Sequence, residues 1–176
     1  MPNYRRALQD GGTWFFTVNL WQRRHNDLLV RHVEVLRAAV KRAQGLRPWQ
    51  VDAWVVLPEH MHCVWTLPPG DSDFALRWRW IKSHFSQSLP ATEARSPSRV
   101  LRGERGIWQR RYWEHWIRDD EDYRRHVDYV HVNPLKHGLV SCVADWPYST
   151  FHRDVRRGLY PKDWAGDASV NVLGDI

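Results

Sequence analysis

Two short runs of β-branched and aromatic residues, separated by a single Pro-Glu pair, constrain the fold of this chain most strongly. The first run is WQVDAWVVL (49–57) and the second is HMHCVWTL (60–67). Val, Trp and Thr favour strands and Pro interrupts them, so the segment predicts a β-hairpin. A third run, TWFFTVNL (13–20), follows a Gly-Gly turn signal and predicts another strand.

Two stretches with helical spacing follow the predicted strands at 13–20 and 60–67. Apolar residues recur every three or four positions over residues 28–44, which predicts an amphipathic helix ended by Gly45. We expect a second helix to begin at a cap provided by Asp71 or Ser72 and to run to about Ser88.

The second half of the chain predicts further elements. A Pro-, Ser- and Arg-rich stretch at 89–106 is typical of a mobile loop or an insertion. A short strand is expected near YWEHWI (112–117), followed by a helix that Asp119 caps and Pro134 ends. A further short helix is expected over 149–157.

The predicted order of elements is β-α-β-β-α-β-α. It indicates an α+β chain with a ferredoxin-like antiparallel sheet and helices packed on one face. The length suits one domain, which we place at residues 1–144, with a C-terminal tail carrying a short helix at 145–176. Spacing does not decide whether the tail packs against the sheet or contacts a ligand.

The charge balance points to nucleic acid as the first partner to consider. Lys and Arg together number 26 against 20 acidic residues, a net charge of +6, and the pI is about 9.7. Most of the cations are Arg, which binds phosphate bidentately. The two cysteines form no CxxC pair, which argues against a cysteine zinc site and fits a reducing cytosol. We expect no signal peptide and no membrane span.

A histidine pair opens the predicted strand at 60–67. Side chains alternate along a strand, so His60 and His62 share a face, while Met61, Cys63 and Trp65 take the other and suit a core. Two imidazoles on one face suit a divalent metal with positions left for oxygen ligands and substrate. The pattern is weak by itself, since nearby histidines are more often surface or hydrogen-bonded residues. A zinc deaminase would need H-x-E and PCxxC, which the sequence lacks.

The helix over DYVHVNP carries a candidate nucleophile. Tyr129 and Asn133 are four residues apart and lie on one helix face. A phenol facing a metal-bound phosphate can form a covalent phosphotyrosine, and Asn133 can supply an oxygen ligand. The alternative is that Tyr129 is an ordinary amphipathic core residue. On chemistry alone Tyr123, Tyr112 and Tyr148 compete for the role.

A longer set of colinear segments resembles a known family. The segments, in chain order, are GGTWFFTVNL, AWVVLPEHMHCVWTLP, YWEHWIRD, HVDYVHVNPLKHGLV and DWPYSTFHRDVRRGLYPKDWAG. Together they resemble the REP-associated tyrosine transposases, bacterial relatives of the single-tyrosine HUH transposases of small insertion sequences. The resemblance covers the chain from about Tyr4 to Gly166.

The resemblance implies a ferredoxin-like HUH nuclease fold with its nucleophile on a C-terminal helix. It implies cleavage and rejoining of single-stranded DNA beside hairpins of repetitive extragenic palindromes (REP), with Mg²⁺ or Mn²⁺ as cofactor. By motif, His60 and His62 match the metal-binding pair, Tyr129 matches the nucleophile and Asn133 matches a further metal ligand. Proteins of this branch are often monomeric, and we expect a bacterial, cytoplasmic, nucleoid-associated protein.

Single-stranded DNA is usually held by cationic grooves and aromatic side chains, and the chain has 12 Trp. Most of these Trp are expected in the core. The candidate phosphate contacts are Arg5, Arg6, Arg77, Arg110, Arg111, Arg153, Arg156 and Arg157. Two other functions remain open at this point: a non-catalytic binder of structured nucleic acid on the same fold, and a metal-dependent phosphodiesterase that uses water.

Overall fold

A computed structural model describes residues 11–166 of the chain. The elements are β1 (Gly12–Asn19), α1 (Leu28–Arg31), α2 (Val33–Leu46), β2 (Gln50–Val56), β3 (His60–Leu67), α3 (Phe74–Gln87), α4 (Pro97–Leu101), β4 (Trp113–Trp116), α5 (Asp120–Lys136), the 3₁₀ turn η1 (Val143–Asp145) and α6 (Phe151–Arg156). The described helices include none that is long and apolar enough to cross a membrane.

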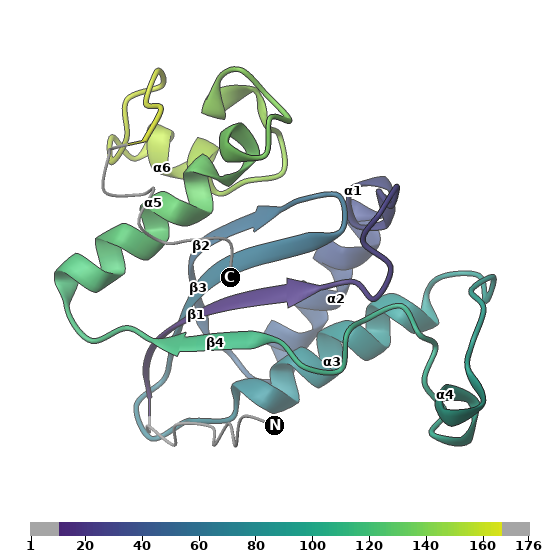
Figure 1. The fold of residues 1–176 in the computed structure, drawn as a ribbon. Helices are drawn as coiled ribbons and strands as arrows, with labels where there is room; N and C mark the ends of the chain where they lie inside the picture. The colour runs from purple at the N-terminus through teal and green to yellow at the C-terminus, as the bar shows by residue number, and fades with distance from the viewer. Residues whose placement is uncertain (1–10, 167–176) are drawn as a thin grey trace.

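The four strands form one antiparallel sheet in the order β2-β3-β1-β4. The predicted hairpin is β2 and β3, and β1 pairs with β3 in a register that sets Asn19 opposite His60. Two crossovers, through α2 and α3, connect the strands, as a split βαβ arrangement requires. The predicted α+β, ferredoxin-like sheet is therefore confirmed (Figure 1).

The helices α2 and α3 cover one face of the sheet, as predicted (Figure 1). Alternate residues of β1 and β3 point into this layer, among them Trp14, Phe16 and Trp65. Trp65 stacks on Trp78 of α3 with ring centroids 4.3 Å apart. We call this side, which buries much of the aromatic content of the chain, the tryptophan face.

The long helix α5 crosses the opposite face of the sheet (Figure 1). It packs Val127 and Val130 against Phe15, Val55 and other apolar residues of the strands. The prediction of helices on one face thus describes the two crossover helices, and the helix that carries Tyr129 covers the other side. We call this second side the histidine face.

The segment after α5 packs against the outer edge of β2. The backbone of Val56 donates to Tyr148 O (2.9 Å) and that of Thr150 donates to Trp54 O (2.9 Å). The indole of Trp146 donates to Val56 O (3.0 Å). Because these bonds occupy the open edge of β2, this part of the predicted tail is joined to the sheet, while the division of domains at residue 144 stays a prediction.

Three predicted helix boundaries were wrong. The cap of α3 is Asp73, whose carboxylate accepts from Leu76 N (3.0 Å), instead of Asp71 or Ser72. The helix expected over 28–44 is interrupted at His32 and continues through Gly45. Pro134 lies inside α5 instead of ending it, because its fixed φ suits a helix and the missing N–H affects only one backbone bond near the end.

The insertion at 89–106 contains the short helix α4 and is held by Arg105. The Arg105 guanidinium donates to the backbone oxygens of Leu89 (3.1 Å) and Pro90 (2.8 Å), and it also pairs with Glu93. At its end the chain rejoins the sheet, where Trp108 forms a bridge with Leu20.

Candidate active site

The histidine pair lies on the histidine face, at the start of β3. The alternation of the strand places His60 and His62 together with ring centroids 4.9 Å apart, while Met61 and Cys63 enter the core of the tryptophan face. Both histidines are buried. The predicted division of this strand between ligand-type and core side chains is confirmed.

Each imidazole is held through the same ring atom. His60 Nδ1 lies 2.9 Å from Glu59 Oε1, and His62 Nδ1 lies 2.8 Å from Thr17 Oγ1. These two contacts use Nδ1 and not Nε2, a pattern found in histidine metal sites, where the second ring nitrogen is fixed by a hydrogen bond. Burial, with the charges of His60 and neighbouring cations, holds the pKa of His62 well below its ordinary value. A neutral imidazole is the form that binds metal.

Glu59 connects the pair to a cation. Burial alone would raise the pKa of Glu59, but its hydrogen bond with His60 and the charges of His60 and Arg23 outweigh burial and lower that pKa. Arg23 Nη2 lies 3.4 Å from Glu59 Oε1. An ionised carboxylate therefore orients His60.

Three side chains, from α5 and from the residue that follows it, lie around the pair. The ring of Tyr129 is buried and stands edge-on to His62, with centroids 5.1 Å apart. Lys136 Nζ lies 5.1 Å from the centroid of the Tyr129 ring, and His137, just beyond the helix, lies 5.2 Å from His60 between ring centroids. Sequence reasoning missed Lys136 and His137. Their spacing of seven and eight residues from Tyr129 placed them on the same helix face.

Asn133 lies between Tyr129 and His137 on this face, because the three residues are spaced by four. Its side chain is buried and its Nδ2 donates to Tyr129 O (3.3 Å). Its Oδ1 is buried and has no hydrogen-bond partner among residues 11–166. A buried carbonyl oxygen of this kind is rare in a folded protein and is available as an oxygen ligand.

The structure separates Tyr129 from the other candidate tyrosines. The hydroxyl of Tyr123 donates to Asp52 (3.3 Å), and burial together with Asp52 raises the pKa of Tyr123 to about 12. Tyr112 packs on the tryptophan face, and Tyr148 lies at the edge of β2. Of the four, Tyr129 is the one in ring contact with His62.

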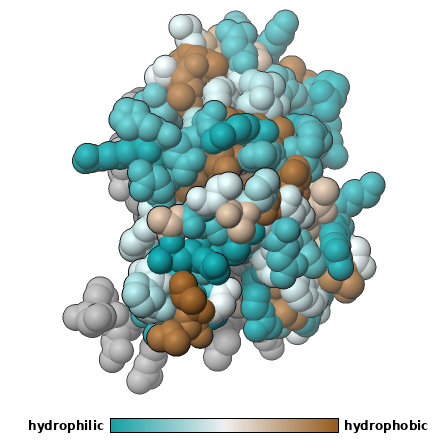
Figure 2. Space-filling view, turned by 90° about the vertical axis from the view of Figure 1, so that its right-hand side faces the viewer, coloured by the Kyte–Doolittle hydropathy of each residue, from teal (hydrophilic) through white to brown (hydrophobic). Residues whose placement is uncertain are grey.

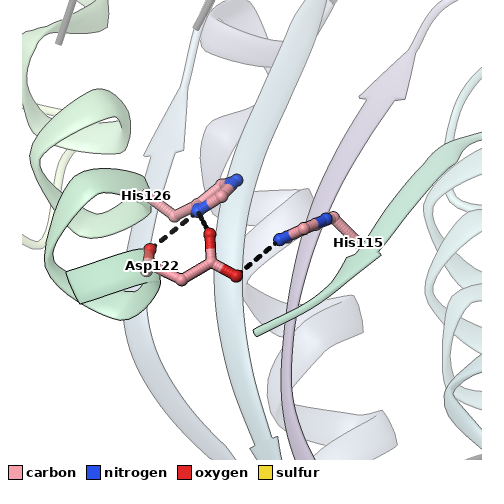
Figure 3. A group of neighbouring side chains, drawn as sticks. All are labelled: His115, Asp122 and His126. Atoms are coloured by element: carbon pink, nitrogen blue, oxygen red, sulfur yellow. Dashed lines mark hydrogen bonds and ion pairs between the residues drawn. The ribbon is translucent and has the colours of Figure 1, made fainter. Parts of the chain in front are cut away.

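A second polar cluster joins β4 to the start of α5 (Figure 3). His115 Nε2 lies 2.9 Å from Asp122 Oδ2, and His126 Nδ1 lies 3.1 Å from Asp122 Oδ1. These three residues could also hold a metal, since their ligand atoms lie within 4.8 Å of one another. The two rings are nearly parallel, at 17°. An imidazole lone pair lies in the plane of its ring, so the lone pairs of two parallel rings do not converge on one ion. The arrangement therefore suits two rings that each bond one oxygen of the same carboxylate.

The predicted arginine contacts fall into distinct groups. Arg77 is 0% exposed and donates to Asp71 and to Pro48 O, so the prediction that it contacts phosphate is wrong. Arg153 donates to Val51 O and pairs with Asp154, and Arg110 pairs with Glu104. Arg110 is nevertheless exposed, as are Arg111, Arg156 and Arg157, and Arg157 Nη1 lies 4.0 Å from Asp154 Oδ1. Arg5 and Arg6 lie outside the described residues.

No protein-family model matches the chain. The chain is 54% identical over 175 residues to the REP-associated tyrosine transposase of Escherichia coli, covering 99% of this chain and 98% of that protein. It is 44% identical over 178 residues to a Haemophilus influenzae protein of the same family name, covering 100% of both. A solved structure of a REP-associated tyrosine transposase bound to a REP hairpin matches with a TM-score of 0.82 and 54% identity, over 95% of this chain and 93% of that one. The chain therefore belongs to the REP-associated tyrosine transposase family.

Proposed function

We propose that this chain cleaves and rejoins single-stranded DNA beside REP-type hairpins, through a 5′-phosphotyrosine formed at Tyr129. The observation that carries the proposal is the contact of the buried Tyr129 ring with His62, at 5.1 Å between centroids, on the face that also holds His60. A binding protein has no need for a buried tyrosine against a histidine pair. A structurally similar transposase is bound to a REP hairpin, which supports the choice of DNA substrate.

Membership of the family implies a metal-dependent reaction, and the site fits a divalent ion. The two fixed imidazoles and the unpartnered Oδ1 of Asn133 form a mixed nitrogen and oxygen donor set, which suits Mn²⁺ or Mg²⁺ with substrate oxygens completing the sphere. When bound by His60, His62 and Asn133, the ion would polarise the scissile phosphate and stabilise its developing charge.

The residues of the chain account for the rest of the step. Tyr129 attacks phosphorus through its phenolic oxygen, which forms an oxygen–phosphorus bond and gives up its proton. The bond from phosphorus to the 3′ oxygen breaks, and that oxygen takes up a proton as a free 3′-OH. Lys136, whose Nζ lies 5.1 Å from the centroid of the Tyr129 ring, supplies a positive charge on the side of the nucleophile. Since the phosphotyrosine link keeps the energy of the broken bond, a second 3′-OH reverses the step and joins a new strand.

The test incubates purified protein with Mg²⁺ or Mn²⁺ and a labelled REP-type hairpin that carries single-stranded flanks. Denaturing gels detect a covalent protein–DNA product, and mass spectrometry locates it. We expect an adduct at Tyr129 that is absent in Tyr129→Phe. The matched control is Tyr123→Phe on the same helix, which removes a hydroxyl bonded to Asp52 and retains the adduct.

The other outcomes point to the competing functions. Cleavage that persists in Tyr129→Phe without an adduct would indicate a water-using phosphodiesterase. Tight binding with no cleavage in either metal would indicate a non-catalytic DNA-binding protein.

A further inference from the structure

A flat, exposed side chain lies in the loop that connects β1 to α1. Trp21 is 61% exposed, although large aromatic side chains are usually buried for most of their surface. Its backbone nitrogen donates to Ile107 O (2.8 Å), which anchors the residue beside the end of the sheet. The exposed ring is therefore attached to a fixed part of the backbone.

A cation from the insertion lies under this ring. The guanidinium of Arg99, in α4, is 4.4 Å from the centroid of Trp21, and Arg99 is only 8% exposed. Glu104 Oε2 lies 3.8 Å from Arg99. Gly106 makes room for it, because a Cβ at that position would meet Arg99 Cδ at 3.3 Å. The insertion at 89–106 thus holds one face of the indole and leaves much of the ring open to solvent.

The ring is close in sequence and space to the histidine pair. Asn19 pairs with His60 across the sheet, and Leu20 N donates to Glu59 O (2.9 Å). Trp21 follows directly, and two residues span at most about 7 Å of extended chain beyond Asn19. Stacked nucleotides rise by about 3.4 Å each, so a base on Trp21 would lie within a few nucleotides of a phosphate at the histidines.

The surroundings of Trp21 carry positive charge. Arg23 and Arg24 follow it in the loop, with the Arg23 side chain 48% exposed and Arg24 also exposed. Figure 2 shows the side of the molecule on which α1 and α4 lie, where hydrophilic residues predominate. Aromatic rings among cations are the usual means by which proteins hold single-stranded nucleic acid.

We propose that Trp21, backed by Arg99, is a stacking platform for an unpaired base of the single-stranded DNA that flanks the scissile phosphate. The bound group is a nucleobase held by its flat face, and Arg23 and Arg24 contact the adjoining phosphates. The proposal rests on the proposed function for its substrate. It assigns a role to the insertion, which supplies the cation that fixes the indole.

The test measures binding of a labelled hairpin with single-stranded flanks by fluorescence anisotropy, with Tyr129→Phe as the parent protein so that no cleavage occurs. We expect Trp21→Ala to raise the Kd by about 5- to 150-fold, the range for loss of one stacked base, and Trp21→Phe to restore part of the affinity. Single abasic sites placed along the flank should weaken binding to the parent at one position and have no effect there on Trp21→Ala.

The control is Leu101→Ala. It alters an 88% exposed side chain of α4, the helix that carries Arg99, and should leave the Kd unchanged. An unchanged Kd in Trp21→Ala, or equal sensitivity of both proteins to every abasic site, would overturn the platform. The adduct assay is independent of this result. An adduct at Tyr129 with no Trp21 effect removes only the platform, and a Trp21 effect with no adduct removes only the proposed nuclease activity.

Discussion

The two faces of the sheet are built from the same strands and differ in what they bury. On β3 the residues Met61, Cys63 and Trp65 enter the tryptophan face, while His60 and His62 enter the histidine face. The first face is packed by aromatic rings from α3 and by aliphatic side chains from α2. The second mixes apolar residues with buried polar groups that have specific partners. Burying polar groups costs folding free energy, so we infer that the apolar packing of the tryptophan face offsets part of the cost of burying the histidine pair.

The largest expected effect is on stability, from the tryptophan face. Trp78 is fully buried and stacked on Trp65, so Trp78→Ala should lower the free energy of unfolding by about 3–5 kcal/mol. Urea denaturation followed by circular dichroism measures the loss. If the division between the faces is correct, the cleavage rate per folded molecule stays within a few-fold of the original. A variant that keeps its stability but loses its cleavage rate would contradict the division.

The converse change is made on the histidine face. His62→Ala removes a proposed metal ligand and should lower the metal-dependent cleavage rate by roughly 100-fold or more, with a smaller change in stability than Trp78→Ala. Its matched control is Cys63→Ala, the next residue on β3, which faces the core. That variant should lose about 1 kcal/mol of stability and keep its cleavage rate. Similar rates in the two variants would contradict the assignment of His62.

A smaller effect is expected from the residue that orients His62. Thr17→Val removes the hydroxyl 2.8 Å from His62 Nδ1 while keeping the shape of the side chain. The expected loss is about 10- to 100-fold in metal affinity or activity, measured by titrating cleavage with Mn²⁺. Thr13→Val serves as the control, because its hydroxyl bonds Thr66 on the same strands away from the histidines (2.8 Å). Equal effects of the two changes would show that Thr17 acts only through packing.

The smallest effect concerns the attachment of α5. Burial opposes ionisation of Asp122, but hydrogen bonds from His115 and Arg118 outweigh it and lower its pKa to about 2 from 3.8. A lowered folded-state pKa gives stability that is present above pH 4 and is lost as the pH falls through about 2. Asp122→Asn should therefore cost on the order of 1 kcal/mol at neutral pH and flatten the stability profile between pH 4 and 2. Thermal unfolding across this range measures it, and an identical profile would exclude the ionised carboxylate as a support of the helix.

The pattern of residues was sufficient to predict the sheet and its alternation. The hairpin formed by β2 and β3, the first strand and the face shared by His60 and His62 follow from period-two spacing, which the backbone of a strand imposes locally. Helix ends were less predictable. Asp71, Ser72 and Asp73 are all suitable caps, and the packing of the turn decides which one is used. Here Asp71 pairs with Arg77 and Arg47, and Asp73 caps the helix.

The sequence by itself determined the strand alternation, the two crossover helices and, through the resemblance of its motifs, the family. Only the tertiary structure decided that α5 crosses the face opposite α2 and α3, that Arg77 is buried, and that the insertion carries Arg99 to Trp21. It also brought Tyr129, which the motifs had singled out, into contact with His62. The physical reason is range. Alternation and capping act within a few residues, whereas Tyr129 and His62, or Arg99 and Trp21, are brought together by the closing of the whole sheet and its helices.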